Sequence, residues 1–209
     1  MSHTLFREGT PQNLKGDFNV IVRPERGLNS EGAVNKLKII LDIFKNHNVV
    51  NFGDVVTGTK FTKTIEEISA ALAENTPLIC GNVDTKEDLM AILLEIIHAD
   101  FGLSVVVTGL YDDIVACCQQ LGLKVHSTNH SLGVWGKVDI LPPASIRQIT
   151  TMCGHGMVPA SLVESVIEDV SNGKLSLKDG VAKLTRPCSC GCFNPNRAER
   201  LIKDLLHKS

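Results

Sequence analysis

The chain lacks a long hydrophobic run, and this excludes a membrane-spanning helix. Its most apolar internal segment, residues 89–107, is interrupted by Glu95, His98 and Asp100, whereas a helix that crosses a bilayer needs about 20 predominantly apolar residues. The first residues of the chain also lack the apolar centre of a signal peptide. We therefore expect a soluble, cytoplasmic protein.

Concentrated positive charge is missing as well. The chain has 21 Lys and Arg residues against 23 Asp and Glu residues, which gives a formal net charge of −2. No basic run forms the stripe that a phosphate backbone attracts. We expect neither a nucleic-acid partner nor a membrane partner, while a small anionic ligand, a redox partner protein and a homo-oligomer all stay open.

The common catalytic signatures are also absent. The sequence has no dinucleotide fingerprint, no P-loop, no Gly-x-Ser-x-Gly elbow and no His-Glu-x-x-His helix. These absences remove the most frequent catalytic classes, but they do not exclude catalysis of another kind. Whether the chain is an enzyme is therefore left open.

What the sequence does contain, from residue 17 to residue 140, is a regular alternation of two patterns. Short runs rich in β-branched residues alternate with segments of helical period, which is typical of β-α units. We expect about five or six strands on this pattern. They are residues 18–22, 49–56, 77–80, 103–107, 124–127 and 134–140. The alternation favours an α/β fold with a largely parallel sheet.

The intervening segments carry apolar residues spaced as on one face of a helix. One set is Leu37, Ile40, Leu41 and Phe44, and a second is Leu89, Ile92, Leu93 and Ile96. Thr64 followed by Glu67 has the spacing of a capping box, which predicts another helix start. We expect these helices to pack against the sheet.

The pattern changes after Pro142 and Pro143. Strand-like runs disappear, and helical stripes follow at residues 163–170 and 198–205. We place a domain boundary here, with an α/β domain in residues 1–141 and a helical metal- or cluster-binding module in residues 142–209.

The helical part carries an unusual concentration of soft ligands. Cys188, Cys190 and Cys192 alternate along the chain, and Cys153 and His155 form a separate short loop upstream. An extended chain advances roughly 6.6 Å per two residues, so the outer thiols of the triplet would be too far apart for one ion unless the backbone curls. Our preferred ligand set is Cys153, Cys188 and Cys190, completed by Cys192 or His155.

Neighbouring residues suit such a site. Asn194 followed by Pro195 predicts the start of a helix whose positive end lies beside the thiols. Gly154 and Gly156 allow a backbone loop to come close to sulfur and to donate N–H groups to it.

The sequence leaves three roles open for these cysteine and histidine residues. An iron–sulfur cluster, such as a [4Fe–4S] centre, suits a crowded set of thiolates, and it would indicate electron transfer or redox-linked small-molecule chemistry. Structural Zn²⁺ is the alternative, although the Cys-x₂-Cys pairs common in zinc sites are absent. A metal-free thiol enzyme would use Cys153 or Cys188 as nucleophile and His155 as base. Disulfides are disfavoured by the odd number of cysteines, seven.

Other candidates lie in the loops that follow the expected strands, where α/β proteins bind ligands. Their small and polar side chains could hold a small anion. These residues are Thr57, Thr59, Lys60, Asn82, Thr108, Asn129 and His130. The remaining thiols, Cys80, Cys117 and Cys118, are expected to be packing residues, because free cysteine behaves as a small hydrophobe.

Overall fold

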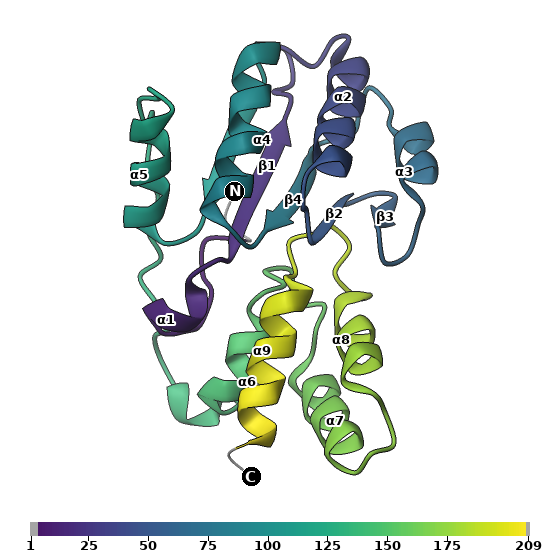
Figure 1. Cartoon of the computed structure of the whole chain (residues 1–209), viewed down its shortest axis with the longest axis vertical. Helices are drawn as coiled ribbons and strands as arrows, with labels where there is room; N and C mark the ends of the chain where they lie inside the picture. The colour runs from purple at the N-terminus through teal and green to yellow at the C-terminus, as the bar shows by residue number, and fades with distance from the viewer. Residues whose placement is uncertain (1–3, 208–209) are drawn as a thin grey trace.

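The computed structural model describes residues 4–207, which form three layers with a β-sheet in the middle (Figure 1). The sheet contains β1 (Phe18–Arg23), β2 (Asn51–Asp54), β3 (Gly58–Thr59), β4 (Ile79–Val83) and β5 (Ser104–Thr108). Their order across the sheet is β3-β2-β4-β1-β5.

Every pair of neighbouring strands in this sheet is antiparallel, so the expectation of a largely parallel sheet is wrong. Strands and helices do alternate along the chain, but the two strands that a helix connects are separated in the sheet by one other strand. β4 lies between β1 and β2, and β1 lies between β4 and β5. This is the interleaved, split β-α-β topology of ferredoxin-like sheets, extended by the short strand β3. Such a fold does not by itself imply a function.

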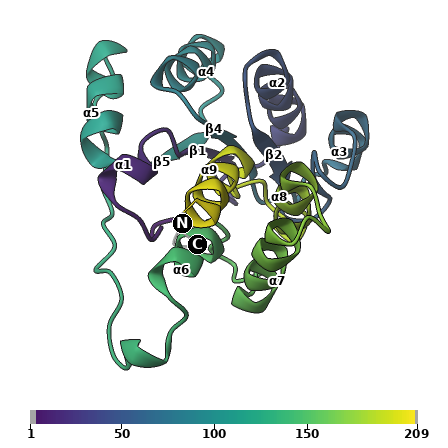
Figure 2. The ribbon, with the colours of Figure 1, turned by 60° about the horizontal axis from the view of Figure 1, so that its bottom comes forward.

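One face of the sheet is covered by the helices that connect or follow its strands (Figure 2). They are α2 (Ala33–Asn46), α3 (Ile65–Ala71), α4 (Lys86–Ala99) and α5 (Tyr111–Gln120). The apolar stripe of α2 is buried at Leu37, Ile40, Leu41 and Phe44. The capping box at Thr64 and Glu67 is confirmed, since each side chain bonds the other residue's backbone N–H.

The opposite face packs against the C-terminal helices. The described part of the chain after β5 contains no further strand. They are α6 (Ala144–Thr150), α7 (Ala160–Ser171), α8 (Leu177–Thr185) and α9 (Pro195–Leu206), while α1 (Pro11–Leu14) is a single turn near the N-terminus. Successive strand residues alternate between the two faces. Val20 and Val22 therefore pack in the core formed with α2–α5, while Ile21 packs in the core formed with the C-terminal helices. The C-terminal helices thus share a core with the sheet.

Two further expected strands are absent from the described chain. Residues 124–127 have no regular structure, and residues 134–140 contain only the short 3₁₀ helix Val138–Ile140. Both segments are exposed, and Trp135 retains 79% of its accessible surface. Strand propensity largely reflects packing against neighbours, and these segments lack such packing. Within residues 4–207, no helix has both the length and the apolar character needed to cross a membrane.

Candidate metal centre

Five cysteines from three separate parts of the chain gather between the sheet and the C-terminal helices. Cys80 lies on β4, Cys153 follows α6, and Cys188, Cys190 and Cys192 lie in the segment between α8 and α9. All five belong to the same core cluster, and none is more than 2% exposed. In Figure 1 the segment between α8 and α9 reaches up to the sheet.

Several of the sulfur atoms lie close to one another. Cys80, Cys190 and Cys192 place their Sγ atoms within 4.8 Å of one another, so this group could hold a metal ion. Cys190 Sγ is 4.0 Å from Cys188 Sγ, and Cys153 belongs to the same buried cluster. The five thiols therefore lie together in one buried group.

Backbone N–H groups also point at the sulfurs. The amides of His155 and Met157 donate to the side chain of Cys153, and the amide of Phe193 donates to Cys188. Hydrogen bonds from backbone N–H groups to sulfur stabilise thiolates and tune the potential of a metal centre.

Without a cation, the thiols resist ionisation. The hydrogen bond of Cys153 to Cys188 raises the pKa of Cys153, and burial raises this pKa further. Its hydrogen bond to Cys190 and burial raise the pKa of Cys80 well above the usual value. A reactive nucleophilic cysteine needs the opposite shift, so the pKa of Cys153 argues against its use as a metal-free nucleophile. A bound metal ion would supply the positive charge that thiolates require.

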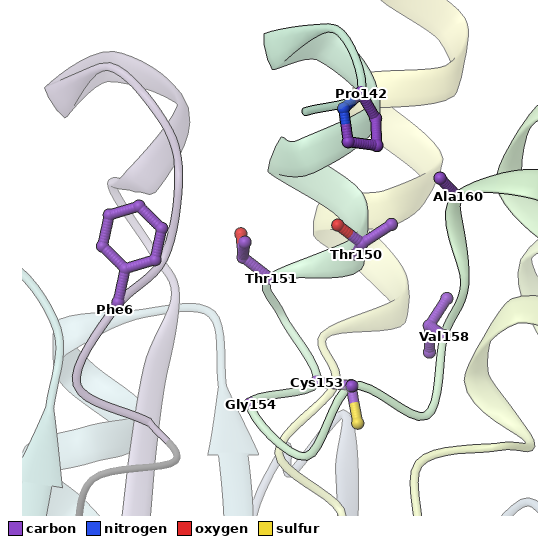
Figure 3. A pocket seen from close by; sticks show the side chains of 9 residues that line it. Phe6, Pro142, Thr150, Thr151, Cys153, Gly154, Val158 and Ala160 are labelled. Atoms are coloured by element: carbon purple, nitrogen blue, oxygen red, sulfur yellow. The ribbon is translucent and has the colours of Figure 1, made fainter. Parts of the chain in front are cut away.

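One end of the thiol group lies near the surface. Residues 154–157 are exposed, and the ring of His155 places Nδ1 at 3.7 Å from Cys190 Sγ. A pocket of about 400 Å³ borders this loop, with Phe6 on one side and Thr150 and Thr151 on the other (Figure 3). The sulfur of Cys153 points away from the two threonines in this view. The thiol group thus has one solvent-facing end.

The loop that carries Cys190 and Cys192 curls at Gly191. Gly191 has φ +85°, in the left-handed region that favours glycine. A Cβ atom there would lie 2.6 Å from the carbonyl carbon of Phe52 and 2.7 Å from the amide nitrogen of Gly53. The missing side chain therefore lets the loop reach the backbone of β2, and the curl brings together thiols that an extended chain would separate.

A row of asparagines anchors the same loop to the sheet. Asn51, Asn82 and Asn19 are paired across β2, β4 and β1, and all three are buried. Asn51 Nδ2 donates to the carbonyl of Phe193 at 2.9 Å. With its amide oriented so that its oxygen accepts from Arg7, Asn19 donates to the carbonyl of Cys192 at 3.1 Å. Polar groups of the sheet thus fix the backbone beside the thiols.

A buried ion network completes this anchor. Asp17 accepts from Arg7 at 2.8 Å and from Arg197 of α9 at 3.3 Å, and its carboxylate is fully buried. Burial alone would raise the pKa of Asp17, but the two guanidinium groups and the amides of Asn82 and Asn194 outweigh it and lower this pKa below the usual value. Asn194 caps α9, as its sequence position indicated.

All five cluster residues singled out from the sequence are thus gathered in one place, although Cys153 and His155 lie far along the chain from Cys188, Cys190 and Cys192. Cys80 was expected to be a packing residue, and its closeness to Cys190 and Cys192 was not predicted from the sequence. Cys80 follows Leu78 and Ile79 on β4, and alternation places it on the face opposite Ile79. The local sequence pattern does not indicate that the thiol loop, which carries Cys188, Cys190 and Cys192, covers this face of the sheet.

The candidate ligand loops do not come together. β2 is antiparallel to β4, so Thr57, Thr59 and Lys60 follow the end of β2 beside Ile79, while Asn82 and Thr108 lie toward the other end of the sheet. Lys60 Nζ donates to the carbonyl of Val49. Asn129 and His130 lie in the exposed segment after α5, where the His130 ring stands 5.2 Å from that of Tyr111.

The chain matches no protein-family model, no curated protein and no solved structure. Its function therefore has to be inferred from the chemistry of the site.

Proposed function

We propose that the protein binds a metal centre through buried thiolates contributed by both the sheet and the C-terminal helices. The observation that carries this proposal is the position of Cys80, whose Sγ lies within 4.8 Å of those of Cys190 and Cys192. Packing of small apolar residues explains a buried cysteine, but it does not explain five buried cysteines gathered beside an imidazole.

As the occupant we propose an iron–sulfur cluster with a redox role. The crowding of the thiols supports this choice, because a multi-iron cluster is a wider target for several sulfurs than one ion is. The surroundings support it as well, since the sulfurs are buried in an apolar core and receive backbone N–H hydrogen bonds. Electrons would pass to a redox partner protein or a small molecule at the exposed end formed by residues 154–157.

Zinc is the second candidate, and one distance favours it. Sulfurs bound to one ion at about 2.3 Å in a tetrahedron lie about 3.8 Å apart, close to the 4.0 Å between Cys188 and Cys190. A zinc ion here would join the sheet to the C-terminal helices. A small ligand of the protein would then bind at another surface. Metal analysis separates the two occupants.

The test is the metal content of protein purified without oxygen, measured as iron, acid-labile sulfide and zinc together with the visible absorption spectrum. We expect iron with sulfide, a brown colour, and loss of both in Cys80→Ser. Cys117→Ser is the matched control, because Cys117 is 1% exposed but belongs to the other core. Zinc without iron would reject the redox role, and protein that binds no metal would reject the centre itself.

A further inference from the structure

A second cavity lies where the N-terminal segment passes the end of β5 and the start of α5. Its volume is about 120 Å³, and it shares no lining residue with the pocket beside Cys153. Residues from three parts of the chain line it, including Thr4 and Arg7, Thr108 at the end of β5, and Gly109 and Leu110 before α5. None of the clustered thiols borders this cavity.

Arg7 brings a positive charge to the cavity. Only 6% of its side-chain surface is exposed, and its terminal nitrogens donate to Asp17 Oδ2 and to the carbonyl of Cys192. Its Nε is buried and has no hydrogen-bond partner among residues 4–207. Because a buried donor without a partner is unfavourable, the guanidinium of Arg7 has capacity for one further acceptor.

The buried ion network at Arg7 has an excess of positive charge. Arg7 and Arg197 both bond to the single carboxylate of Asp17, which also borders the cavity. A further carboxylate of the network, Asp84, is only half-buried and accepts hydrogen bonds from two asparagine amides. Buried charges are normally paired, so an anion beside Arg7 would balance the second guanidinium.

The start of α5 adds N–H donors at the edge of the cavity. The helix begins after Leu110, whose side chain makes no capping hydrogen bond. The first N–H groups of a helix have no partner within it and carry partial positive charge, which favours a bound anion. Of the two acidic residues in the first turn, Asp113 pairs with Lys86 and Asp112 is exposed.

Two hydroxyl groups complete the polar lining. Thr4 Oγ1 and Thr108 Oγ1 are 2.9 Å apart, and either can donate to the other. Because this bond uses one of the two hydroxyl hydrogens, the other hydrogen can be donated to a ligand. A guanidinium, helix amides and a hydroxyl together form a donor set that suits the oxygens of an anion.

We propose that this cavity binds a small oxyanion, held by the guanidinium of Arg7, the hydroxyl of Thr108 and the first amides of α5. The cavity has room for several water molecules. It therefore admits an anion of the size of phosphate, sulfate or a short carboxylate, and it excludes a nucleotide. This site does not depend on the proposed metal centre.

Titration of the full chain tests the proposal. Inorganic phosphate, sulfate and acetate are added at constant ionic strength, with chloride as the reference, and the thermal unfolding midpoint and the heteronuclear NMR spectrum are recorded. We expect at least one of the three to bind saturably, to raise the midpoint, and to shift the Nε–H signal of Arg7 together with the amide signals of residues 110–113. Binding of phosphate and sulfate without acetate would identify a tetrahedral anion, whereas acetate alone would identify the carboxylate of an organic molecule.

Two variants and one control locate the anion. Thr108→Val should weaken binding about ten-fold, because it removes one hydrogen bond to a charged ligand. Leu110→Asp should raise the unfolding midpoint without added anion and abolish the response to it, because its carboxylate caps α5 and supplies negative charge at the cavity. Thr57→Val is the matched control, since Thr57 follows β2 and does not line the cavity. It should bind the anion as the wild type does.

A response no larger than that to chloride for all three anions would overturn the proposal. Saturable binding that is unchanged in both Thr108→Val and Leu110→Asp would place the anion elsewhere and would overturn it as well. Because Leu110→Asp is expected to stabilise the fold, loss of binding in this variant is distinguished from unfolding by its raised midpoint.

Discussion

At the scale of single residues, a few buried polar groups hold the thiol loop in place. Arg197 is the largest fully buried side chain of the described chain. It donates to Asp17 and to the backbone carbonyls of Glu8 and Asn13. Arg7 connects Asp17 to the carbonyl of Cys192. The carboxylate of Asp17 therefore balances two cations that have little access to water.

Replacing this carboxylate tests its role. We expect Asp17→Asn to lower the free energy of unfolding by about 3–5 kcal/mol, because it leaves buried guanidinium groups without their partner. Glu25→Gln is the control, since Glu25 pairs with Arg23 at a partly exposed position and such pairs contribute about 0–1 kcal/mol. Urea unfolding followed by circular dichroism measures both variants. Equal effects would contradict a special role for Asp17.

The carboxylate of Asp17 also makes the stability of the protein depend on pH in the acidic range. The folded-state pKa of Asp17 lies below its usual value of 3.8. Its contribution to stability is therefore present above that value and is lost as the pH falls through the lower folded-state pKa. Asp17→Asn should remove this part of the acid sensitivity.

At the scale of elements, the contact between the thiol loop and β2 depends on Gly191. We expect Gly191→Ala to cost about 1–2 kcal/mol for the left-handed conformation and about 1–3 kcal/mol more for the overlap with the backbone of β2. Because the overlap moves the loop off the sheet, metal binding should weaken too.

Gly173→Ala is the matched control for this substitution. Gly173 has φ +69°, yet a Cβ atom there would meet nothing within 4 Å. We expect only the conformational cost of about 1–2 kcal/mol and unchanged metal binding. Thermal unfolding and metal content measure the two variants side by side. If both lost the same stability and kept their metal, the close approach of Gly191 to β2 would be unimportant.

At the scale of the whole molecule, the candidate metal centre lies where the sheet and the C-terminal helices meet. A metal bound there would stabilise the folded state, because the unfolded chain cannot bring Cys80, Cys153 and Cys190 together. Binding replaces thiol protons, so affinity should rise with pH.

Removal of the metal should reverse the dependence of stability on pH. In the metal-free protein, hydrogen bonds to neighbouring thiols, together with burial, raise the folded-state pKa values of Cys80, Cys153 and Cys192 above the usual 9.0. Their contribution to stability is full below that value and is lost as the pH rises above it, because only the unfolded chain then releases its protons. We expect metal-free protein to be less stable at pH 10 than at pH 8.

Unfolding by urea under reducing conditions, with and without metal, measures this effect. Circular dichroism is the suitable signal, because Trp135 is already 79% exposed in the folded state. Cys80→Ala should show a weaker loss above pH 9. A metal-free protein whose stability does not change over this range would contradict the raised thiol pKa values.

The local elements of the fold could be predicted from the sequence. The stripe Leu37, Ile40, Leu41 and Phe44 is buried on one helix, and the capping signals at Thr64 and Asn194 begin α3 and α9. The strands at residues 18–22 and 103–107 lie within one residue of β1 and β5. These features depend on the period of the backbone and on hydrogen bonds between residues a few positions apart, and both are visible in a linear sequence.

The sequence by itself determined the apolar stripes of the helices, and it singled out four of the five cysteines that the fold gathers. Only the tertiary structure decided which strands are neighbours and that Cys80 meets Cys190 and Cys192. The physical reason is that alternation along a strand defines two faces, but it does not identify what covers either face. Cys80 reaches the thiol loop because Gly191 lets that loop approach β2 and the buried network of Asp17 holds it there.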